Sequence, residues 1–389
     1  MLRNRIMFHV QHLLGIGHLQ RALRLSGHLR DAGFEVNLVS GGMPSPILKA
    51  EGVILHQLDP ARAADAEFSQ ILDADGNPAD DAWRARRARA LLDVFDACAP
   101  DALLIELFPF GRRQFAFELL PLLQAARGRK NPPLVLCSVR DIILPSAKPG
   151  RSEEAVRRAR DHFDHILVHG DPAFLGLEET YPAAAALSEK IFYSGYIAGA
   201  LPCAPAERDG KNEILISAGG GAVGRELMRA ALEARAHSKA AGHLVWRLLI
   251  GPAAPQGEMR ELQAIAPPGI VVEAARADFP QMLLHCAGSV SQAGYNTVMD
   301  ILGVKALRQL PAVLAPFATE REKEQTLRAM ALDRAGLAVH LPAMDIGPEG
   351  LASAVDRALS QPRPPVRLPD MNGGPATADF LRERLVWWI

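Results

Sequence analysis

The sequence predicts an α/β protein made of two doubly wound domains, each with a parallel sheet covered by helices. Short apolar runs alternate with longer amphipathic segments along most of the chain, which is typical of β-α units. The chain has 389 residues, more than one hydrophobic core usually supports. The pattern breaks at residues 195–210, where proline and glycine accumulate, and then restarts. We therefore expect domains at residues 1–198 and 211–365, followed by a helix within residues 370–389.

In the first domain, short apolar runs predict strands at residues 6–10, 35–40, 53–58, 102–105, 134–138, 165–168 and 191–193. Amphipathic segments predict helices near residues 19–32, 81–97, 113–127 and 153–162. Gly33 stands where a glycine is expected to end the first helix. Residues 59–80 are polar and rich in alanine and aspartate, and we interpret them as an insertion or a mobile loop. The basic run at residues 84–89 is interpreted as a solvated helix face.

In the second domain, the same pattern predicts strands at residues 214–217, 244–250, 270–272, 288–290, 312–315 and 338–340. The predicted helices cover residues 225–239, 258–266, 279–285, 295–302, 322–335 and 349–359. After a proline-rich connector, residues 377–388 predict a last helix whose apolar end needs a partner surface, and we expect it to pack on the first domain.

Composition argues against several classes of partner and site. The formal net charge of -1 gives no overall field that would recruit nucleic acid or an anionic membrane. The four cysteines are far apart and form no C-x-x-C pair, so we expect buried thiols in a reducing compartment: Cys98, Cys137, Cys203 and Cys286. Neither a signal peptide nor a run of 18 apolar residues is present in this sequence, and we expect a cytoplasmic protein.

The loop after the first strand places a histidine beside two glycines. Gly15 and Gly17 allow a tight turn, and His18 then begins a helix at the carboxyl end of the sheet. Gln20 replaces the third glycine of a dinucleotide fingerprint, which disfavours a hydride-transfer cofactor. A histidine at this point can act as a general base, and the alternative is a capping histidine without a ligand.

A glycine-rich turn also opens the second domain. Gly219, Gly221 and Gly224 satisfy G-x-G-x-x-G formally, but the second strand ends in Gly251 and Pro252 without the acid that binds a dinucleotide ribose. We retain the phosphate-binding part of this signal and reject a nicotinamide cofactor. The alternative is a glycine turn without a ligand.

Residues 288–300 combine an apolar strand, a turn of small residues and a helix. Backbone N–H groups and the helix dipole at such a helix start favour a phosphate, and Asp300 is placed to accept hydrogen bonds from a ribose diol. An ordinary strand-to-helix corner with a solvated aspartate is the alternative.

Four polar residues follow strands of the first domain and are candidates for contacting an acceptor, because ligands bind at the carboxyl ends of parallel strands: Glu106, Arg112, Arg140 and Asp141. A surface pair of Arg140 with Asp141, or a helix-capping Asp141, is the alternative. No metal site is predicted. Asp73 and Asp75 lack the later glutamate of a calcium loop, and three nearby histidines straddle a helix end and a strand: His162, His165 and His169.

The second-domain motifs resemble those of MurG-like glycosyltransferases. The resemblance is carried by Ser291-x-x-Gly294-x-x-Thr297-x-x-Asp300, by residues 311–317, by Glu324-Gln325 and by residues 335–338, together with the Gly15-x-Gly17-His18 loop. It implies the GT-B fold, in which two Rossmann-like domains face a cleft and a C-terminal helix crosses back to the first domain. Two further segments, at residues 108–113 and 138–141, resemble a group of predicted glycosyltransferases.

The resemblance also implies roles for individual residues. His18 would deprotonate an acceptor hydroxyl or help to neutralise the leaving diphosphate, Asp300 would bind the ribose, and Glu324 with Gln325 would meet the sugar or ribose. The full implied donor site comprises Gly17, Gly219, Gly220, Gly221, Ala222, Phe279, Ser291, Gly294, Asn296, Thr297, Asp300, Glu324 and Gln325. The sequence departs from the family where Asp300 replaces the more usual glutamate, and where a longer segment joins it to Pro311.

The sequence therefore predicts a metal-independent glycosyltransferase that moves a hexose-type sugar from a nucleotide-diphosphate sugar, expected to be a UDP-sugar, to an acceptor hydroxyl. No cofactor is expected beyond this co-substrate. The apolar segment at residues 108–110 leaves open a lipid-linked acceptor and a peripheral contact with a membrane. Two alternatives remain: the His18 loop also resembles that of nucleotide-sugar hydrolases, in which the histidine activates water, and a non-catalytic scaffold would keep the fold without turnover.

Overall fold

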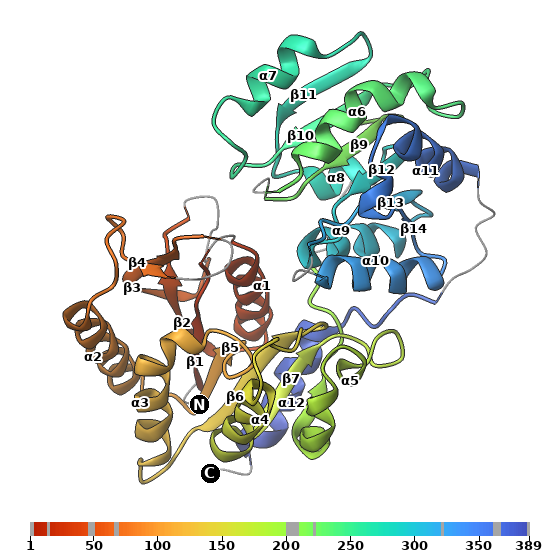
Figure 1. The fold of residues 1–389 in the computed structure, drawn as a ribbon. Coiled ribbons are helices and arrows are strands. Elements are labelled where there is room, and N and C mark those ends of the chain that lie inside the picture. The colour runs from red at the N-terminus through yellow and green to blue at the C-terminus, as the bar shows by residue number, and fades with distance from the viewer. Residues whose placement is uncertain are drawn as a thin grey trace. The chain divides into compact units, whose positions relative to one another are not determined.

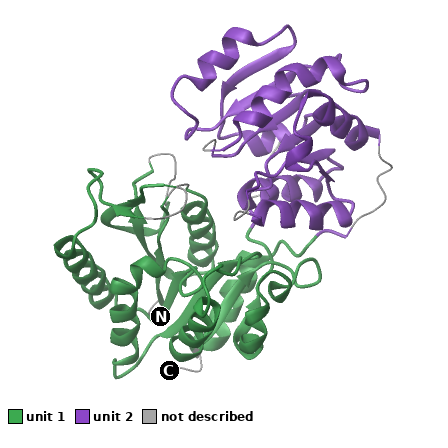
Figure 2. Ribbon diagram, viewed as in Figure 1, with its two compact units in different colours: residues 1–197, 369–389 green, residues 198–368 purple. Residues whose placement is uncertain are grey.

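The protein consists of two compact units joined at two points of the chain (Figure 2). The computed structural model describes residues 4–13, 16–45, 51–65, 70–199, 210–220, 223–319, 323–360 and 367–386. The first unit is formed by Met1–Ile197 with Pro369–Ile389, and the second by Ala198–Leu368. Among the described residues, no helix combines the length and apolar character needed to cross a membrane.

The first unit contains an eight-stranded sheet in the order β4-β3-β2-β1-β5-β6-β7-β8 (Figure 1). Its neighbouring strands are parallel except for the antiparallel pair β3 and β4. The strands are β1 (Arg5–Val10), β2 (Glu35–Gly42), β3 (Ile54–Ala63), β4 (Ile71–Leu72), β5 (Ala102–Glu106), β6 (Leu134–Arg140), β7 (His165–His169) and β8 (Ile191–Tyr193). The α-helices are α1 (Gly17–Asp31), α2 (Asp81–Cys98), α3 (Ala116–Arg127), α4 (Arg151–His162), α5 (Leu177–Thr180) and α12 (Gly373–Val386), and the 3-10 helices are η1 (Arg113–Phe115) and η2 (Pro182–Lys190).

Two apolar cores cover the two faces of this sheet. Successive strand side chains point to opposite faces, so Ile6 and Phe8 of β1 join the core under α1 and α12, while Met7 joins the core under α2, α3 and α4. Near-continuous apolar strands are expected where both faces are covered, and all five residues of β5 are buried.

Helix α12 belongs to the first unit although it follows the second in sequence. Its Phe380 stacks on Phe192 of β8 with ring centroids 4.3 Å apart, and Arg382 donates to the carbonyl oxygen of Ala32 at the end of α1. Gly374 lies against His28 of α1 so closely that a Cβ atom would clash. These contacts confirm the prediction that the last helix returns to the first domain.

The two segments that connect the units are hydrogen-bonded to each other within the first unit. The N–H of Tyr196 donates to the carbonyl oxygen of Asp370 at 2.7 Å, and the N–H of Gly373 donates to that of Tyr196 at 3.0 Å. Gly195 has φ of 85° and a Cβ atom there would meet Asp370, so this crossing favours glycine.

The second unit contains a six-stranded parallel sheet in the order β11-β10-β9-β12-β13-β14. The strands are β9 (Ile214–Ser217), β10 (Trp246–Ile250), β11 (Ile270–Ala274), β12 (Gly288–Ser291), β13 (Ala312–Leu314) and β14 (Val339–His340). The helices are α6 (Arg225–His237), α7 (Glu258–Ile265), α8 (Phe279–Leu283), α9 (Tyr295–Lys305), α10 (Glu324–Arg334) and α11 (Pro348–Ser360), with the 3-10 helix η3 (Ala343–Asp345). This is the 3-2-1-4-5-6 order of dinucleotide-binding folds, whose ligands lie where the order reverses, here between β9 and β12. In the first unit the order reverses between β1 and β5.

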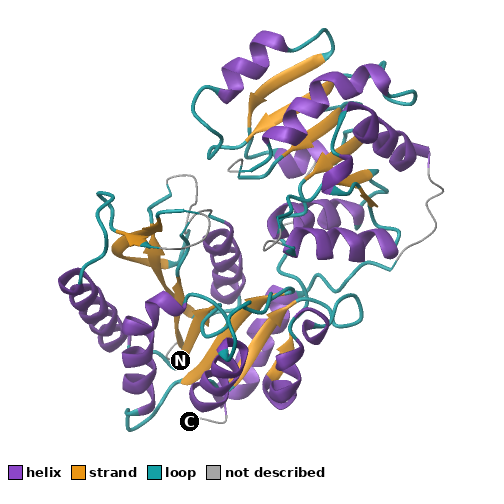
Figure 3. Cartoon of the chain, in the orientation of Figure 1, coloured by secondary structure: helices purple, strands orange, loops and turns teal. Residues whose placement is uncertain are grey.

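The alternation of strands, orange in Figure 3, with helices confirms the predicted α/β class in both units. Residues 59–80 are expected to be an insertion or mobile loop, and this prediction is wrong for residues 59–63 and 71–72, which are strands. β3 continues to Ala63 with Leu58 and Ala61 buried, and β4 pairs with it. Apolar periodicity predicts β3 only as far as residue 58, because beyond it only Ala61 is buried, and β4 has only two residues. The sequence also gave no sign of α5 or η2, which are too short for periodicity.

Candidate functional site

In the first unit, His18 is held by a buried carboxylate. His18 is the second residue of α1, and Glu106 is the last residue of β5, the strand next to β1. His18 Nδ1 lies 2.9 Å from Glu106 Oε1, with the two side chains 14% and 1% exposed. An ionised carboxylate only accepts, so Nδ1 carries the proton and Nε2 keeps its lone pair. His18 is therefore oriented as a base, and Glu106, predicted to contact an acceptor, lies behind it.

Glu106 is fixed by further partners. Arg21, one turn after His18, forms an ion pair with Glu106 Oε1. Ser138 of β6 donates from Oγ to Glu106 Oε2 at 2.9 Å, and Ser138 Oγ also lies 3.0 Å from His169 Nε2. Because Ser138 has one hydroxyl proton, His169 must donate to it from Nε2. A chain of hydrogen bonds thus crosses the ends of β5, β6 and β7 behind His18.

Burial and cationic neighbours keep His18 neutral. Burial lowers the pKa of His18 well below its usual 6.5, and the charges of Arg112, Arg140 and Arg21 lower it further. The pKa of Arg112 is lowered to about 10, first by burial and then by Arg140 and Arg21. Neutral imidazole is the form that accepts a proton, so His18 is available as a general base at neutral pH.

The other predicted acceptor-side residues lie at the same edge of the sheet. Arg112 follows β5 with a φ of 57°, and its Nε donates to the carbonyl oxygen of Gln11 at 2.6 Å. Arg140 is the last residue of β6. Asp141 is fully buried and accepts from the hydroxyl of Tyr196 at 3.4 Å, so the alternative of a surface pair with Arg140 is wrong. The segment at residues 108–110 does not form a surface patch, because Phe108 is fully buried in the core.

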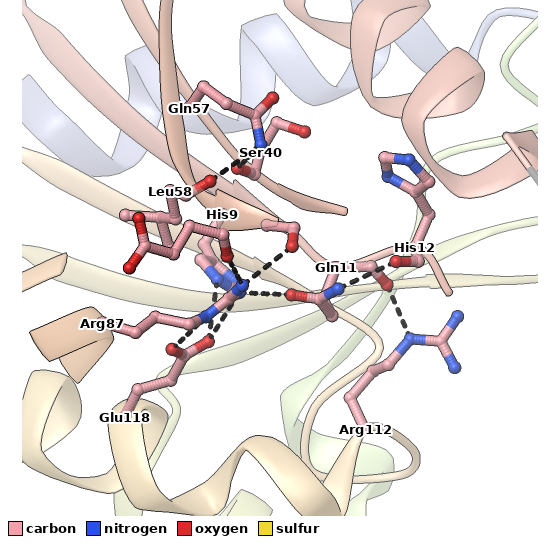
Figure 4. A network of polar contacts seen from close by, with 11 residues as sticks. His9, Gln11, His12, Ser40, Gln57, Leu58, Arg87, Arg112 and Glu118 are labelled. Carbon is pink, nitrogen blue, oxygen red and sulfur yellow. Dashed lines mark hydrogen bonds and ion pairs between the residues drawn. The ribbon is translucent and has the colours of Figure 1, made fainter. Parts of the chain in front are cut away.

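A buried arginine network supports this edge (Figure 4). Arg87 of α2 is fully buried and forms two hydrogen bonds to Glu118 of α3, from Nε at 2.6 Å and from a terminal nitrogen at 3.1 Å. It also donates to the carbonyl oxygens of Gly41 and Asp59 at 2.8 and 2.5 Å and to the side chain of Gln11. The network joins α2 and α3 to the ends of β1 and β2 and to the middle of β3.

The Arg87 network corrects the sequence interpretation of residues 84–89 as a solvated helix face. Arg84, Arg86 and Arg89 are exposed, whereas Arg87 takes part in the buried stripe of α2. The sequence does contain a signal for the burial of Arg87. The buried stripe of α2 has a residue at every fourth position, and Arg87 lies on it between Trp83 and Leu91.

In the second unit, the turn after β9 meets the start of α9. The two strands before these segments are neighbours, with Ser217 paired to Ser291. Gly219 has φ of 63°, and a Cβ atom there would lie 3.5 Å from Thr297 Oγ1. Gly294 precedes α9 and supplies no side-chain cap, and its Cβ position, like that of Gly220, faces open space. This geometry suits a phosphate at the helix N-terminus. Gly221 and Ala222 lie outside the described residues.

Further predicted donor-site residues differ in their surroundings. Asp300 is half-buried and lies one turn beyond Asn296 and Thr297 on the same face of α9. Ser291 is fully buried with its hydroxyl 3.3 Å from that of Ser289, so it contributes to the sheet interior. Phe279 is half-buried at the first position of α8.

Helix α10 supports the start of α9 through an arginine that the motif analysis missed. Arg328 is buried, donates to the carbonyl oxygen of Ala293 at 2.7 Å, and lies over the ring of Tyr295. Arg328 also forms an ion pair with Glu324 at 2.8 Å. This ion pair occupies one oxygen of the Glu324 carboxylate, which is predicted to meet the sugar or ribose. Gln325 Oε1 accepts from the N–H of Phe317 at 3.2 Å.

The remaining sequence expectations concern cysteines. Cys98, Cys137 and Cys286 are buried free thiols, as predicted, and Cys203 lies outside the described residues. Burial raises the pKa of Cys286 to about 12, so this thiol is not a nucleophile at neutral pH.

Sequence comparison finds distant relatives. No model of a known protein family matches the chain. The UDP-N-acetylglucosamine--N-acetylmuramyl-(pentapeptide) pyrophosphoryl-undecaprenol N-acetylglucosamine transferases of Brucella suis and Brucella abortus are 28% identical over 169 residues. The match covers 43% of this chain and 43% of each relative, so it spans less than half of their length.

Solved structures show similarity over nearly the whole chain. The calicheamicin glycosyltransferase CalG4 has a TM-score of 0.58 at 15% identity, covering 100% of this chain and 95% of its own. Acinetobacter baumannii MurG has a TM-score of 0.55 at 16% identity, with coverages of 98% and 99%. The spinosyn rhamnosyltransferase SpnG, complexed with thymidine diphosphate, has a TM-score of 0.57 at 17% identity, with coverages of 98% and 96%. The chain therefore has the GT-B fold of these glycosyltransferases, and part of it is similar in sequence to the Brucella N-acetylglucosamine transferases.

Proposed function

We propose that the protein is a glycosyltransferase that moves a hexose-type sugar from a nucleotide-diphosphate sugar to an acceptor hydroxyl. The observation that carries this proposal is the His18–Glu106 pair, which presents a neutral, oriented imidazole at the reversal point of a GT-B sheet. The relatives and structural neighbours include a transferase named for UDP-N-acetylglucosamine, one complexed with thymidine diphosphate and one complexed with UDP. They support a nucleoside diphosphate as the leaving group, and we propose uridine as the base.

His18 acts on the acceptor. Its Nε2 takes the hydroxyl proton while the acceptor oxygen forms a bond to the anomeric carbon. The bond from that carbon to the diphosphate oxygen breaks, and the diphosphate leaves with the electron pair. Glu106 stabilises the imidazolium that forms, as the ion pair strengthens when His18 gains a charge.

The second unit binds the departing diphosphate. Backbone N–H groups at the start of α9 and in the Gly219 turn favour the developing negative charge. Asp300 accepts hydrogen bonds from the ribose hydroxyls one turn further along α9. We propose that these groups replace a divalent cation, so that chelators leave the rate unchanged.

The test begins with identification of the donor. The purified chain is incubated with a panel of nucleotide sugars, and each product is followed by mass spectrometry and each affinity by calorimetry. We expect one nucleoside diphosphate to bind, with affinity lost in Asp300→Ala. Absence of binding by every nucleotide, with Asp300→Ala indistinguishable from the parent, would refute the proposal. Release of free sugar without any acceptor, lost in His18→Asn, would identify a hydrolase instead.

A further inference from the structure

We infer that His169 is a positioning residue for the base His18, through a chain of hydrogen bonds that all point towards Glu106. The chain links, in order, Ser194, His169, Ser138 and Glu106. The negative charge of Glu106 sets its direction. The use of this chain in sugar transfer rests on the proposed function, whereas its direction follows from the donors and acceptors of the buried side chains alone.

The chain crosses four neighbouring strands on the side of the sheet that faces α1. Glu106, Ser138 and His169 each lie two positions after a leucine of the core under α1 and α12, so their side chains point to that face. They belong to β5, β6 and β7, and Ser194 directly follows β8. Each of the four residues is at most 1% exposed, so bulk water does not compete for these hydrogen bonds.

The number of protons on each group gives the direction of each link. An ionised Glu106 only accepts, so the Ser138 hydroxyl donates to its Oε2 at 2.9 Å. Ser138 has no second proton, so the imidazole of His169 donates from Nε2 across the 3.0 Å contact. Burial lowers the pKa of His169 well below 6.5, and the ring is neutral at neutral pH. Its Nδ1 therefore accepts the hydroxyl proton of Ser194 at 2.8 Å.

The chain holds the carboxylate that orients His18. Glu106 Oε1 lies 2.9 Å from His18 Nδ1, so rotation of the carboxyl group would break the contact that fixes the tautomer. The Ser138 hydroxyl opposes this rotation because it binds the other oxygen. The N–H of His169 occupies a lone pair of Ser138 and leaves the hydroxyl proton directed at Glu106. His169 therefore acts on the base through two intervening side chains.

The distant end of the chain is able to reverse. The Ser194 hydroxyl lies 2.9 Å from the carbonyl oxygen of Gly195, in addition to its contact with His169 Nδ1. When Nδ1 carries the proton, Ser194 accepts from His169 and donates to Gly195. Both directions are therefore satisfied at this end, and the choice between them is made at Glu106.

Exchange of Glu106 for glutamine should reverse the whole chain. His18 and Arg21 both face Oε1, so the amide oxygen of Glu106→Gln is expected on their side and its N–H group on the side of Ser138. Ser138 then accepts from the amide and donates to His169 Nε2. The proton of His169 moves to Nδ1 as a result.

The first experiment determines the tautomer of His169 by two-bond nitrogen–hydrogen NMR correlation spectra of the full chain with isotope-labelled histidine. The signal is assigned by its loss in His169→Gln. We expect a neutral ring that is protonated at Nε2 in the parent and at Nδ1 in Glu106→Gln. Protonation of the parent at Nδ1 or at both nitrogens would overturn the inference, as would an unchanged tautomer in folded Glu106→Gln. If that variant does not fold, the parent spectrum still decides the direction.

Two further variants establish the path. Ser138→Ala removes the hydroxyl that transmits the direction, so His169 should have the same tautomer in Ser138→Ala and in Glu106→Gln/Ser138→Ala. Ser26→Ala is the matched control, because it removes another buried hydroxyl of the same unit that has no hydrogen-bond partner among the described residues. It should leave His169 as in the parent. A tautomer that still responds to the Glu106 exchange without Ser138 would show that the charge acts through space, and would overturn the chain.

The second experiment tests the effect of His169 on the base. His169→Leu removes the N–H donor, whereas His169→Gln keeps an N–H group near the position of Nε2. In the same spectra, the fraction of His18 protonated at Nδ1 should fall in His169→Leu and recover in His169→Gln. Equal His18 tautomers in the parent and in folded His169→Leu would overturn the positioning role.

Kinetics connect the chain to the proposed reaction. With the donor identified in the screen, kcat should fall several-fold in His169→Leu with the donor KM unchanged, and His169→Gln should restore most of it. A kcat equal to that of the parent in His169→Leu would overturn the positioning role. If no nucleotide sugar is turned over, only the proposed function fails, because the NMR measurements need no donor and still decide the direction of the chain.

Discussion

His18 depends for its chemistry on a carboxylate 88 positions away in the sequence. The hydrogen bond from Nδ1 to Glu106 fixes the tautomer, and burial together with the surrounding arginines lowers the pKa of His18 and keeps the ring neutral. Glu106 therefore sets the orientation of the base, and the other surroundings of His18 set its protonation state.

Removal of the base should reduce the chemical step. We expect His18→Gln to lower kcat by about 10²–10⁴-fold with little change in the donor KM, because general-base catalysis contributes that much. Glu106→Gln should lower kcat less, since the imidazole remains but loses its negative partner. His237→Gln alters an exposed histidine of the second unit and should keep the parent rate in the same steady-state assay. Full activity in His18→Gln would contradict this role.

The dependence of kcat/KM on pH should show the effect of the neighbouring arginines on the pKa of His18. Activity requires neutral His18, so the rate should fall only as pH drops through a pKa well below 6.5. Arg112→Gln removes a cation that lowers this pKa, so the acid limb of the kcat/KM profile should move to higher pH. An acid limb at the same pH in Arg112→Gln and the parent would show that this charge does not act on the base.

The depressed histidine pKa values also affect stability. The pKa of His18 and of His169 is lower in the folded state than the usual 6.5, so the unfolded chain binds more protons. The free energy of unfolding is therefore not reduced by these two histidines above about pH 6.5. It decreases progressively as pH falls from there towards the folded pKa values.

At the scale of elements, the Arg87 network holds five segments together through one side chain. A Cβ atom at Gly41 would overlap the ends of the Gln11 and Arg87 side chains, so a larger residue there would displace the network. The network reaches the candidate site through Gln11, whose carbonyl oxygen orients Arg112.

Breaking this network should be costly. Arg87→Leu leaves the Glu118 carboxylate buried without its main partner, and we expect a loss of about 3–5 kcal/mol in the free energy of unfolding measured with urea. Arg87→Leu/Glu118→Leu removes both charges and should recover much of that loss. Arg86→Leu, on the exposed face of α2, is the matched control and should unfold like the parent.

Helix α10 gives a parallel prediction for the second unit. Arg328→Met removes the donor to the Ala293 carbonyl and should loosen the start of α9, so the affinity for the nucleoside diphosphate should fall about tenfold, equivalent to about 1.4 kcal/mol. Arg334→Met changes an exposed residue of the same helix and should bind normally by calorimetry. Equal affinities for the two variants would argue against a supporting role of Arg328.

The sequence could predict elements better than it could predict pairings. Apolar runs located β1, β5 and β6, and their ends located His18, Glu106 and Arg140, because these signals are local. The contact between His18 and Glu106 depends on β1 lying beside β5, which no local pattern specifies. The four-residue spacing of α2 places Arg87 on its buried stripe, but no local pattern specifies the partners of Arg87, which come from β2, β3, α3 and the residue after β1. Only their convergence makes a buried guanidinium tolerable.

At the scale of the whole molecule, each unit has its own core, so the two should respond to core mutations separately. Phe380→Ala should lower the stability of the first unit by about 3–5 kcal/mol, because it opens the contact of α12 with β8. Leu351→Ala in α11, fully buried, should affect the second unit instead. Hydrogen exchange followed by mass spectrometry assigns each loss to its unit, and protection lost equally in both units by either variant would contradict independent cores.

The return of α12 to the first unit has a consequence for the order of events on the ribosome. The second unit is one continuous stretch of chain and can complete its core as soon as it has emerged. The first unit must wait for residues 369–386, and until then the apolar side of α1 that meets Phe380 and Leu381 stays uncovered. The nascent chain therefore carries an unfinished domain throughout synthesis of the second unit, and its need for chaperones should increase when translation of that unit is slowed.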